Sequence, residues 1–534
     1  MQKNISLIYP LDKIVDFENT QIKLLNISDE TLHSLELNNI FDLAGSRLNE
    51  FFSDDKETIE YRQRMFSDLI ANEKLSQLLL ELSPVLNDIS EIRRLSDENQ
   101  SVDSYLYSIT EVELYITAVE QLYNGLKEIK DNIKSEAFTL LTDNIFELVE
   151  SEYYKDLNKR LKELTSRVRE VKSVTIGVNL DSRLLPEKAG VLSVNNERFK
   201  SGDLLQKILR LDFRSNEYTC IASLTPFKKG VNDNQQNALN TAMYNALNDV
   251  FKGSMKSWKK VVDTYVLENS NFLIKLAPEI EFVVKAVEFV NIIKETGNEL
   301  TFPTVCEKQA KIFDVKGLYN PVVATKLNEK LVLNDFVFDK NGMFYILSGP
   351  NRGGKSVITC AIGHIFALCQ LGLPVPANEA RISPVDGIFT HFPTDAEDTI
   401  DKGRLGEECA RLDDIFDYVT EYSLVLLDES LSSTGSYEAS YIASEVLSGI
   451  SMAKCRGVFS THLHELASMI DNINNNCTSK GGERIDTLVA GMEEGERSFI
   501  ISRRKPDGKS YASDIASKYG ISLDKIMKKI EKNK

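Results

Sequence analysis

The residues best suited to chemistry lie in one short segment, Gly349-Pro-Asn-Arg-Gly-Gly-Lys-Ser356. The segment fits the phosphate-loop pattern G-x-x-x-x-G-K-[ST], although an ordinary glycine-rich turn between a strand and a helix can look similar. The glycines allow backbone N–H groups to surround an anion, and the following helix adds the positive end of its dipole. Lys355 can reach the β- and γ-phosphates, and the Ser356 hydroxyl can coordinate Mg²⁺. We therefore assign nucleotide binding to Gly349, Pro350, Asn351, Arg352, Gly353, Gly354, Lys355 and Ser356.

Other polar residues follow apolar runs further along the chain. The run Leu424–Leu427 reads as a buried strand that ends in Asp428 and Glu429. A carboxylate at such a strand end can hold Mg²⁺, and the next one can polarise an attacking water, so Asp428 is assigned to the metal and Glu429 to catalysis. His462 follows a second strand and can sense the γ-phosphate, which makes it a second catalytic candidate. Asn378 either reaches Mg²⁺ or the attacking water, or makes a local turn bond.

The elements that must position these residues alternate between strand and helix. An apolar strand, 343–347, precedes the loop, and an apolar helix, 357–366, follows it. Strand patterns recur at 311–315, 331–338 and 457–460, with helical patterns between the later ones. This alternation predicts an α/β nucleotide-binding domain over residues 311–510.

The preceding 310 residues have a different character. Helical spacing of apolar residues begins at 57–70 and continues through long, charged, amphipathic stretches to about 174, and it returns over 234–296. Between these stretches, β-branched and alternating runs predict a small β-rich insert at about 174–226. We therefore expect a mostly α-helical core and lever domain over 1–310 that contains this insert.

Composition limits the class of protein. The 534 residues carry a net charge of −17, which weighs against broad affinity for nucleic acid but does not exclude a local basic patch. Seven cysteines without C-x-x-C spacing favour reduced thiols. The sequence has no signal-peptide core and no apolar run that could span a bilayer, so a cytoplasmic protein without a membrane partner is expected.

Several motifs together resemble the ATPase domain of the MutS family, a branch of the ABC-type ATPases. Their order and spacing match over 311–510. Ser510–Gly520, followed by Ile521-Ser-Leu523, resembles that family's C-terminal helix-turn-helix, which supports dimerisation and is placed here at 511–534. Ile59–Arg64 resembles the start of the family's helical core and lever domain. Besides the phosphate loop, the motifs are Val375-Pro-Ala377, Ile388-Phe-Thr390, Gly403-Arg404, Glu421-Tyr-Ser-Leu-Val-Leu-Leu-Asp-Glu429 and Ser460-Thr-His-Leu-His-Glu-Leu466.

The resemblance implies that ATP and Mg²⁺ bind in a dimer, either a homodimer or a mixed dimer. In the family, each ATP also touches a signature segment of the other subunit, which maps onto Gly403, Arg404 and Gly406. Repair members carry Ser-Thr where this chain has Leu405-Gly406, and they carry an Arg that the stretch 431–435 lacks. The resemblance therefore implies that the part of the ATP site within one subunit is intact, while the part contributed by the other subunit is altered. Slow or partner-dependent turnover is expected.

Three functions fit these residues. The first is a MutS-like ATPase that closes on DNA without the family's Phe-x-Glu mismatch sensor, a motif that this sequence does not contain. The insert holds basic residues that either contact phosphates or form a solvated charged face: Lys188, Arg198, Lys200, Lys207, Arg210 and Arg214. The alternative is an ATP-dependent reactivating factor for a cobalamin-dependent lysine or ornithine aminomutase, with that mutase as client protein. A non-hydrolysing nucleotide switch is the third, and Asp428-Glu429 argues against it.

Overall fold

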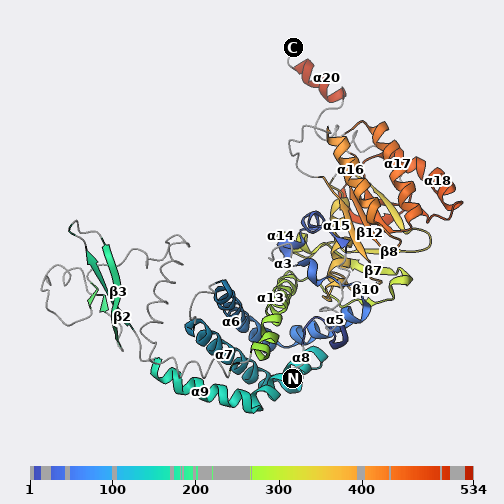
Figure 1. Cartoon of the computed structure of the whole chain (residues 1–534). Helices are drawn as coiled ribbons and strands as arrows, with labels where there is room; N and C mark the ends of the chain where they lie inside the picture. Colours follow the sequence, from blue (N-terminus) through green and yellow to red (C-terminus); the bar gives the residue numbers. More distant parts are fainter. Residues whose placement is uncertain are drawn as a thin grey trace. The chain divides into compact units, whose positions relative to one another are not determined.

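The protein is described here by a computed structural model. It describes residues 5–13, 26–41, 48–98, 105–168, 173–180, 182, 186–195, 200–201, 219–220, 265, 267–350, 352–393, 403–431, 434–493, 496–505 and 523–532. The chain divides into two compact units (Figure 1). One contains residues 74–133 and 139–280, and the other contains 6–73, 134–138 and 281–534.

The second unit is built on a seven-stranded sheet with the order β1-β11-β12-β13-β9-β14-β15. All neighbouring strands are parallel except the final pair, β14 and β15. Every residue of β9, β11, β12 and β13 is buried, as expected for parallel strands covered on both faces. The strands are β1 (Asn26–Ile27), β9 (Phe344–Ser348), β11 (Gly387–His391), β12 (Leu424–Asp428), β13 (Arg456–Ser460), β14 (Ile485–Glu493) and β15 (Glu496–Arg503).

Helices connect these strands and supply the apolar core. Helix α15 (Lys355–Gln370) follows β9 directly and is buried along almost its whole length, in contact with β12 and β13. A large core cluster joins the sheet to residues of α16 (Gly403–Tyr418), α17 (Ser436–Ala453) and α18 (His464–Thr478). The alternation of strand and helix predicted from residue 311 onward is therefore present, and the fold of this region is mixed α and β.

A smaller sheet with the order β6-β10-β7-β8 lies within the same unit. Its strands are β6 (Thr304–Val305), β7 (Phe313–Leu318), β8 (Asn334–Phe338) and β10 (Glu379–Ile382), and α14 (Pro321–Leu327) follows β7. Aromatic rings join this sheet to the central sheet. Phe313 stacks on Phe366 of α15 with ring centroids 4.6 Å apart, and Phe336 meets Tyr345 of β9 edge to face.

The N-terminal part of the chain contributes to this unit as well. Its elements are α2 (Asp29–Ser34), α3 (Leu37–Phe41), η1 (Asn49–Phe51) and α5 (Lys56–Ala71). Strand β1 pairs with β11 at the edge of the main sheet, a contact that the local sequence pattern did not predict. Arg62 of α5 is fully buried and donates to the carbonyl oxygens of Ile8, Phe51 and Gln370, so it ties α5 to α15.

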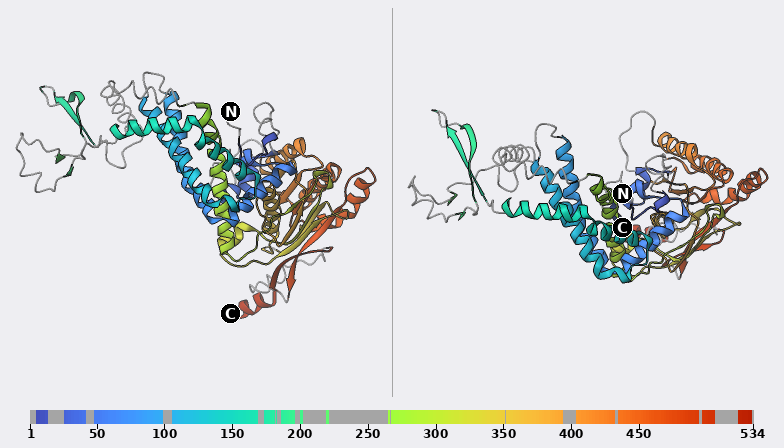
Figure 2. Two further views of the ribbon diagram at one scale, coloured as in Figure 1. Left: turned by 90° about the horizontal axis from the view of Figure 1, so that it is seen from below. Right: turned by 60° about the horizontal axis from the view of Figure 1, so that its bottom comes forward.

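The first unit is dominated by long helices, as the sequence predicted (Figures 1 and 2). They are α6 (Glu73–Glu98), α7 (Tyr105–Ile129), α8 (Glu136–Glu150), α9 (Glu152–Val168) and the first part of α13 (Leu267–Glu295), with η2 (Lys130–Asn132) after α7. The buried carboxylate of Glu111 accepts hydrogen bonds from Arg93 and from the hydroxyl of Tyr265. This polar cluster fixes α6, α7 and the chain before α13 to one another.

The predicted β-rich insert is described only in part. Strands β2 (Ser173–Leu180) and β3 (Pro186–Asn195) form an antiparallel pair, and β4 (Lys200–Ser201) pairs with β5 (Thr219–Cys220). Lys188 and Lys200 lie on β3 and β4, whereas Arg198, Lys207, Arg210 and Arg214 lie outside the described residues. So does the first part, 234–264, of the helical stretch predicted over 234–296.

At the C-terminal end, α20 (Leu523–Lys532) is the described part of the predicted helix-turn-helix. None of the described helices is both long enough and apolar enough to cross a bilayer.

Candidate functional site

The strand order brings three of the predicted segments to one edge of the sheet. Strands β12, β13 and β9 are consecutive neighbours and run parallel, so their carboxyl ends meet. The phosphate-loop segment follows β9, Asp428 is the last residue of β12 with Glu429 directly after it, and His462 follows β13. Ligands of open α/β sheets bind at this carboxyl edge.

The backbone of the phosphate-loop segment requires glycine at its two ends. Gly349 has a φ of +143°, and a Cβ there would lie 2.7 Å from the Cβ of Ala490 on β14. Gly354 has a φ of +88° and is the N-cap of α15, which no side chain caps. The N–H groups of the first turn of α15 are therefore left for an anion, and the helix dipole favours one.

Lys355 is held in place at the start of α15. Its side chain is buried, and Nζ donates to the carbonyl oxygens of Gly349 and Pro350, each at 3.2 Å. Burial lowers the pKa of Lys355, while the carboxylates of Glu429 and Asp428 act against that shift. The ammonium group is thus aimed into the loop, where phosphate oxygens could replace the two carbonyl partners.

Glu429 and His462 meet beside this lysine. His462 Nε2 lies 2.7 Å from Glu429 Oε1 and 3.5 Å from Lys355 Nζ. Glu429 has a φ of +46°, a left-handed conformation that is uncommon outside glycine. A carboxylate that is oriented by an imidazole at the mouth of a phosphate loop could accept a proton from water.

Asp428 has the features of a metal ligand. It is buried, and its Oδ1 has no hydrogen-bond partner among the described residues. Burial raises the pKa of Asp428, and the hydroxyl groups of Ser460 and Ser356 act in the opposite direction. Carboxylate and hydroxyl oxygens are the ligands that Mg²⁺ prefers, so Asp428 and Ser356 fit a magnesium ion.

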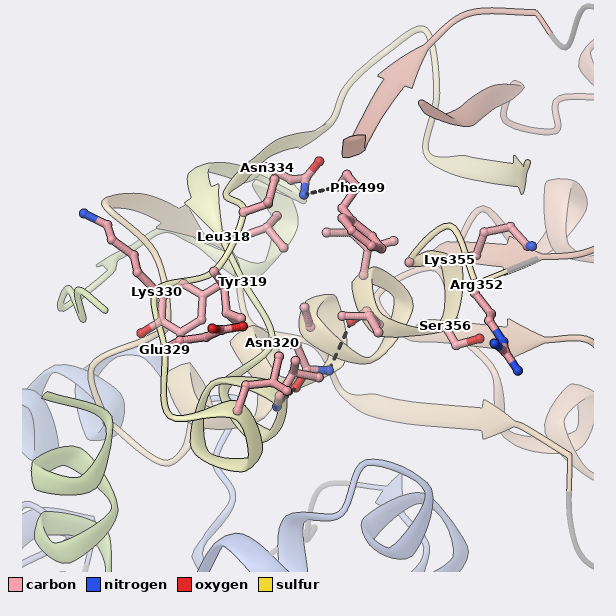
Figure 3. A pocket seen from close by; sticks show the side chains of 18 of the residues that line it. Leu318, Tyr319, Asn320, Glu329, Lys330, Asn334, Arg352, Lys355, Ser356 and Phe499 are labelled. Carbon is pink, nitrogen blue, oxygen red and sulfur yellow. Dashed lines mark hydrogen bonds between the residues drawn. The ribbon is translucent and has the colours of Figure 1, made fainter. Parts of the chain in front are cut away.

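A cavity of about 470 Å³ opens beside these residues and extends past α15 toward β8 and α14. Its lining includes Arg352, Lys355, Ser356 and Glu429 at one end. Arg352, at a φ of +59°, is exposed there, and Figure 3 draws its side chain pointing away from Phe499. The rest of the wall is largely apolar and includes Leu318, Val323 and Leu331.

Phe499 is a wall residue that the sequence did not single out. Its ring lies over the phosphate loop, 3.5 Å from the position that a Cβ on Gly354 would take. The side-chain amide of Asn334 donates to the Phe499 carbonyl at 3.1 Å and accepts from the Ile501 N–H at 2.7 Å, which fixes β15 against β8 (Figure 3). Phe499 has a φ of +56° and a side chain that is 46% exposed. An aromatic ring that is fixed in position and exposed beside a phosphate loop could stack on a nucleotide base.

The remaining predicted residues are placed as follows. Asn351 lies outside the described residues. Gly403 and Arg404 begin α16, and Gly406 lies in its first turn and is not among the residues lining the cavity. Leu405 packs against the hydrophobic core. Asn378 is exposed in the loop before β10, where its side chain covers Gly317 of β7, and it does not line the cavity either.

Comparison with known families gives two matches. The model of MutS domain V matches residues 345–516, which include the whole phosphate-loop segment, Asp428, Glu429 and Phe499. The model of the MutS2 N-terminal domain matches residues 54–296. Together the two matches cover most of the chain.

Individual relatives agree with these models. A protein of Prochlorococcus marinus (strain MIT 9312) named "DNA mismatch repair protein MutS" is 34% identical over 214 residues, which are 39% of this chain and 22% of the relative. A protein of the same name from Clostridium perfringens is 30% identical over 38% of this chain and 22% of the relative. Another, from Persephonella marina, is 24% identical over 99% of this chain and 59% of its own length.

The chain thus aligns with less than two thirds of the length of each of these relatives. The two family matches, together with the relative that aligns along nearly the whole chain, identify this protein as a member of the MutS family.

Proposed function

We propose that the chain binds ATP with Mg²⁺ in the cavity beside the phosphate loop and hydrolyses it to ADP and phosphate. One observation carries the proposal, namely that His462 Nε2 lies within 3.5 Å of both Lys355 Nζ and Glu429 Oε1 at the N-terminus of α15. Domain V, which this region matches, is the ATPase domain of the MutS family. ATP hydrolysis needs a cation for the phosphates, a general base for the water and a group that orients this base. Lys355, Glu429 and His462 supply these three functions at one place.

The residues of the site have separate roles in phosphoryl transfer. The loop N–H groups and Lys355 hold the β- and γ-phosphates. Glu429 accepts a proton from a water whose oxygen bonds to the γ-phosphorus, while the bond from that phosphorus to the bridging oxygen of ADP breaks. His462 orients the carboxylate of Glu429 through the 2.7 Å contact. Asp428 and Ser356 would hold Mg²⁺, which when bound neutralises charge on the phosphates.

The adenine base of ATP occupies the apolar part of the cavity. Phe499 supplies a ring face beside Gly354, and Leu318, Val323 and Leu331 form the surrounding wall. Adenine would be recognised there chiefly by stacking and burial, because most of the lining residues in this part of the cavity are apolar.

We further propose that the site is completed in a homodimer or mixed dimer. Gly403, Arg404 and Gly406 at the start of α16 would meet the nucleotide of the other subunit. Leu405 packs against the core, and a leucine has no side-chain hydroxyl to offer at this position. The remaining contacts would be the backbone N–H of Gly406 and the side chain of Arg404, and turnover is accordingly slow or dependent on the partner.

The proposed client is DNA, on which ATP binding would close the dimer. The relatives reported above are all named as DNA mismatch repair proteins, and this supports DNA over an aminomutase client. A salt titration of binding to mismatched, branched and fully paired DNA tests the proposal. Affinity that falls steeply with salt, together with ATP turnover that rises on adding DNA, is the expected result. No binding at low salt would overturn the DNA proposal and would leave the ATPase proposal standing.

A further inference from the structure

The conformation of Glu429 depends on contacts from both neighbouring strands. On the β13 side, the N–H of Glu429 donates to the Ser460 carbonyl at 2.8 Å. On the β11 side, the next residue, Ser430, donates from Oγ to the carbonyl oxygen of His391 at 3.1 Å. The residue after that, Leu431, is buried in the core cluster. The short stretch beyond β12 is therefore anchored on three sides.

These anchors hold an unfavourable backbone. Glu429 and Leu431 have φ values of +46° and +66°, in the left-handed region that residues other than glycine avoid. Such conformations persist only where the surroundings impose them, and they cluster at functional sites. Without its anchors the stretch would relax, and the Glu429 carboxylate would leave its position beside His462 and Lys355.

The imidazole of His391 makes a second contact with Ser430. Its Nδ1 lies 2.7 Å from Ser430 Oγ, and both side chains are almost completely buried. With the Ser430 hydroxyl donating to the His391 carbonyl, Nδ1–H is the donor that we assign to the second contact. Ser430 and His391 are thus joined twice, once through the backbone of His391 and once through its ring.

We infer that Ser430 and His391 form a buried clamp that positions Glu429 to accept a proton from the water that attacks ATP. Neither residue touches the nucleotide cavity, because neither is among the residues that line it. They act through Glu429, so they are positioning residues. The inference rests on the hydrolytic role proposed for Glu429.

The test is steady-state ATP hydrolysis by the full chain, with kcat and KM measured separately. Ser430→Ala deletes one oxygen, and we expect kcat to fall about tenfold or more while KM for ATP stays within about twofold, since small misplacements of a catalytic group reduce rates by such factors. Ser423→Ala is the matched control. Ser423 is also buried, lies directly before the opposite end of β12 and donates to Asp386, so kcat should not change.

Substitution of the ring gives an independent measurement. His391→Phe keeps an aromatic ring without the donor and should lower kcat as Ser430→Ala does. His391→Asn places an amide N–H near the position of Nδ1 and should restore much of the rate, whereas His391→Gln, whose amide falls near Nε2, should not. Thermal unfolding midpoints establish that each variant is folded, and Ser430→Ala carries the test if the ring variants do not fold.

Glu429→Gln is the reference that separates the two proposals. If Glu429→Gln is inactive while Ser430→Ala and His391→Phe keep the wild-type kcat, the clamp has no role and the proposed function survives. Equal rescue by Asn and Gln at position 391 would also overturn the clamp. If Glu429→Gln hydrolyses ATP normally, the role proposed for Glu429 fails, and the clamp fails with it.

Discussion

His462 and Glu429 come from neighbouring parallel strands and meet with 2.7 Å between imidazole Nε2 and carboxylate Oε1. The contact fixes the direction of one carboxylate oxygen at the mouth of the phosphate loop. Lys355 Nζ lies 3.5 Å from the same imidazole nitrogen, so one ring nitrogen adjoins both the cation and the base of the proposed reaction.

Glu429→Gln should stop hydrolysis without preventing ATP binding. The amide keeps the shape of the side chain but cannot accept the proton of the attacking water, so we expect turnover to fall roughly 10²- to 10⁴-fold. Phosphate release measures turnover, and equilibrium dialysis measures ATP affinity. Glu445→Gln, an exposed substitution on α17, is the control. Normal turnover by Glu429→Gln would mean that another group positions the water.

Lys355→Ala should abolish measurable ATP binding. The buried ammonium is the cation placed closest to the loop carbonyls of Gly349 and Pro350, and its loss leaves the phosphate charge without that partner. We expect affinity to fall by about 100-fold or more, as for the loss of charge-assisted hydrogen bonds. Titration calorimetry compares this variant with Lys340→Ala, which removes an exposed lysine. Unchanged ATP affinity in Lys355→Ala would refute the role of Lys355 and the phosphate loop in binding the phosphates.

Asp428→Asn should weaken the binding of Mg²⁺ rather than the binding of free nucleotide. The buried Oδ1 without a hydrogen-bond partner is the oxygen expected to meet the ion. We expect the Mg²⁺ concentration for half-maximal hydrolysis to rise at least about tenfold, because a neutral amide oxygen is a poorer ligand for a hard cation. Asp413→Asn, an exposed change on α16, should leave the Mg²⁺ titration unaltered. An identical titration for Asp428→Asn would place the metal elsewhere.

Phe499→Ala should reduce affinity for ATP but not for inorganic triphosphate. Stacking of a base on an aromatic ring contributes about 1–3 kcal/mol, which corresponds to roughly 5- to 150-fold in affinity. Ile500 follows it on β15 and is similarly exposed, 44% against 46%, so Ile500→Ala is a matched control. Competition binding against a fluorescent nucleotide gives both affinities. Equal losses for ATP and triphosphate would show that Phe499 supports the loop and does not contact the base.

Acidification should destabilise the unit that holds the sheet, partly through His364. This residue is fully buried, and burial lowers its pKa to about 4. The unfolded chain takes up the proton near pH 6.5 while the folded chain takes it up only near pH 4, so stability falls as the pH falls through that window. The loss approaches about 3 kcal/mol for one such histidine.

Denaturant unfolding between pH 7 and pH 4 measures this dependence. His364→Asn should show a shallower loss of stability on acidification than the wild type. His33→Asn, which removes an exposed histidine on α2, should follow the wild-type curve. Parallel curves for wild type and His364→Asn would mean that folding does not shift the pKa of His364.

Short-range patterns in the sequence predict much of this protein. The phosphate-loop segment, the acidic end of β12 and the alternation of strands and helices after residue 311 are all visible in single runs of residues. The long helices of the first unit follow equally from local apolar spacing. These features are predictable because the backbone conformation of each depends on residues within a few positions of one another.

The tertiary structure decides what depends on strand order and on partners distant in the chain. The pairing of β1 with β11 brings residues 26 and 27 to the main sheet, although nothing in their local pattern distinguishes them from a loop. Phe499 reaches the phosphate loop only because β15 is fixed by Asn334, which is 165 positions away. Ser430 and His391 are 39 positions apart and meet only because β11 and β12 are neighbours. Sequence spacing therefore determined which groups could do the chemistry, while the order of the strands determined which of them lie within reach of one another.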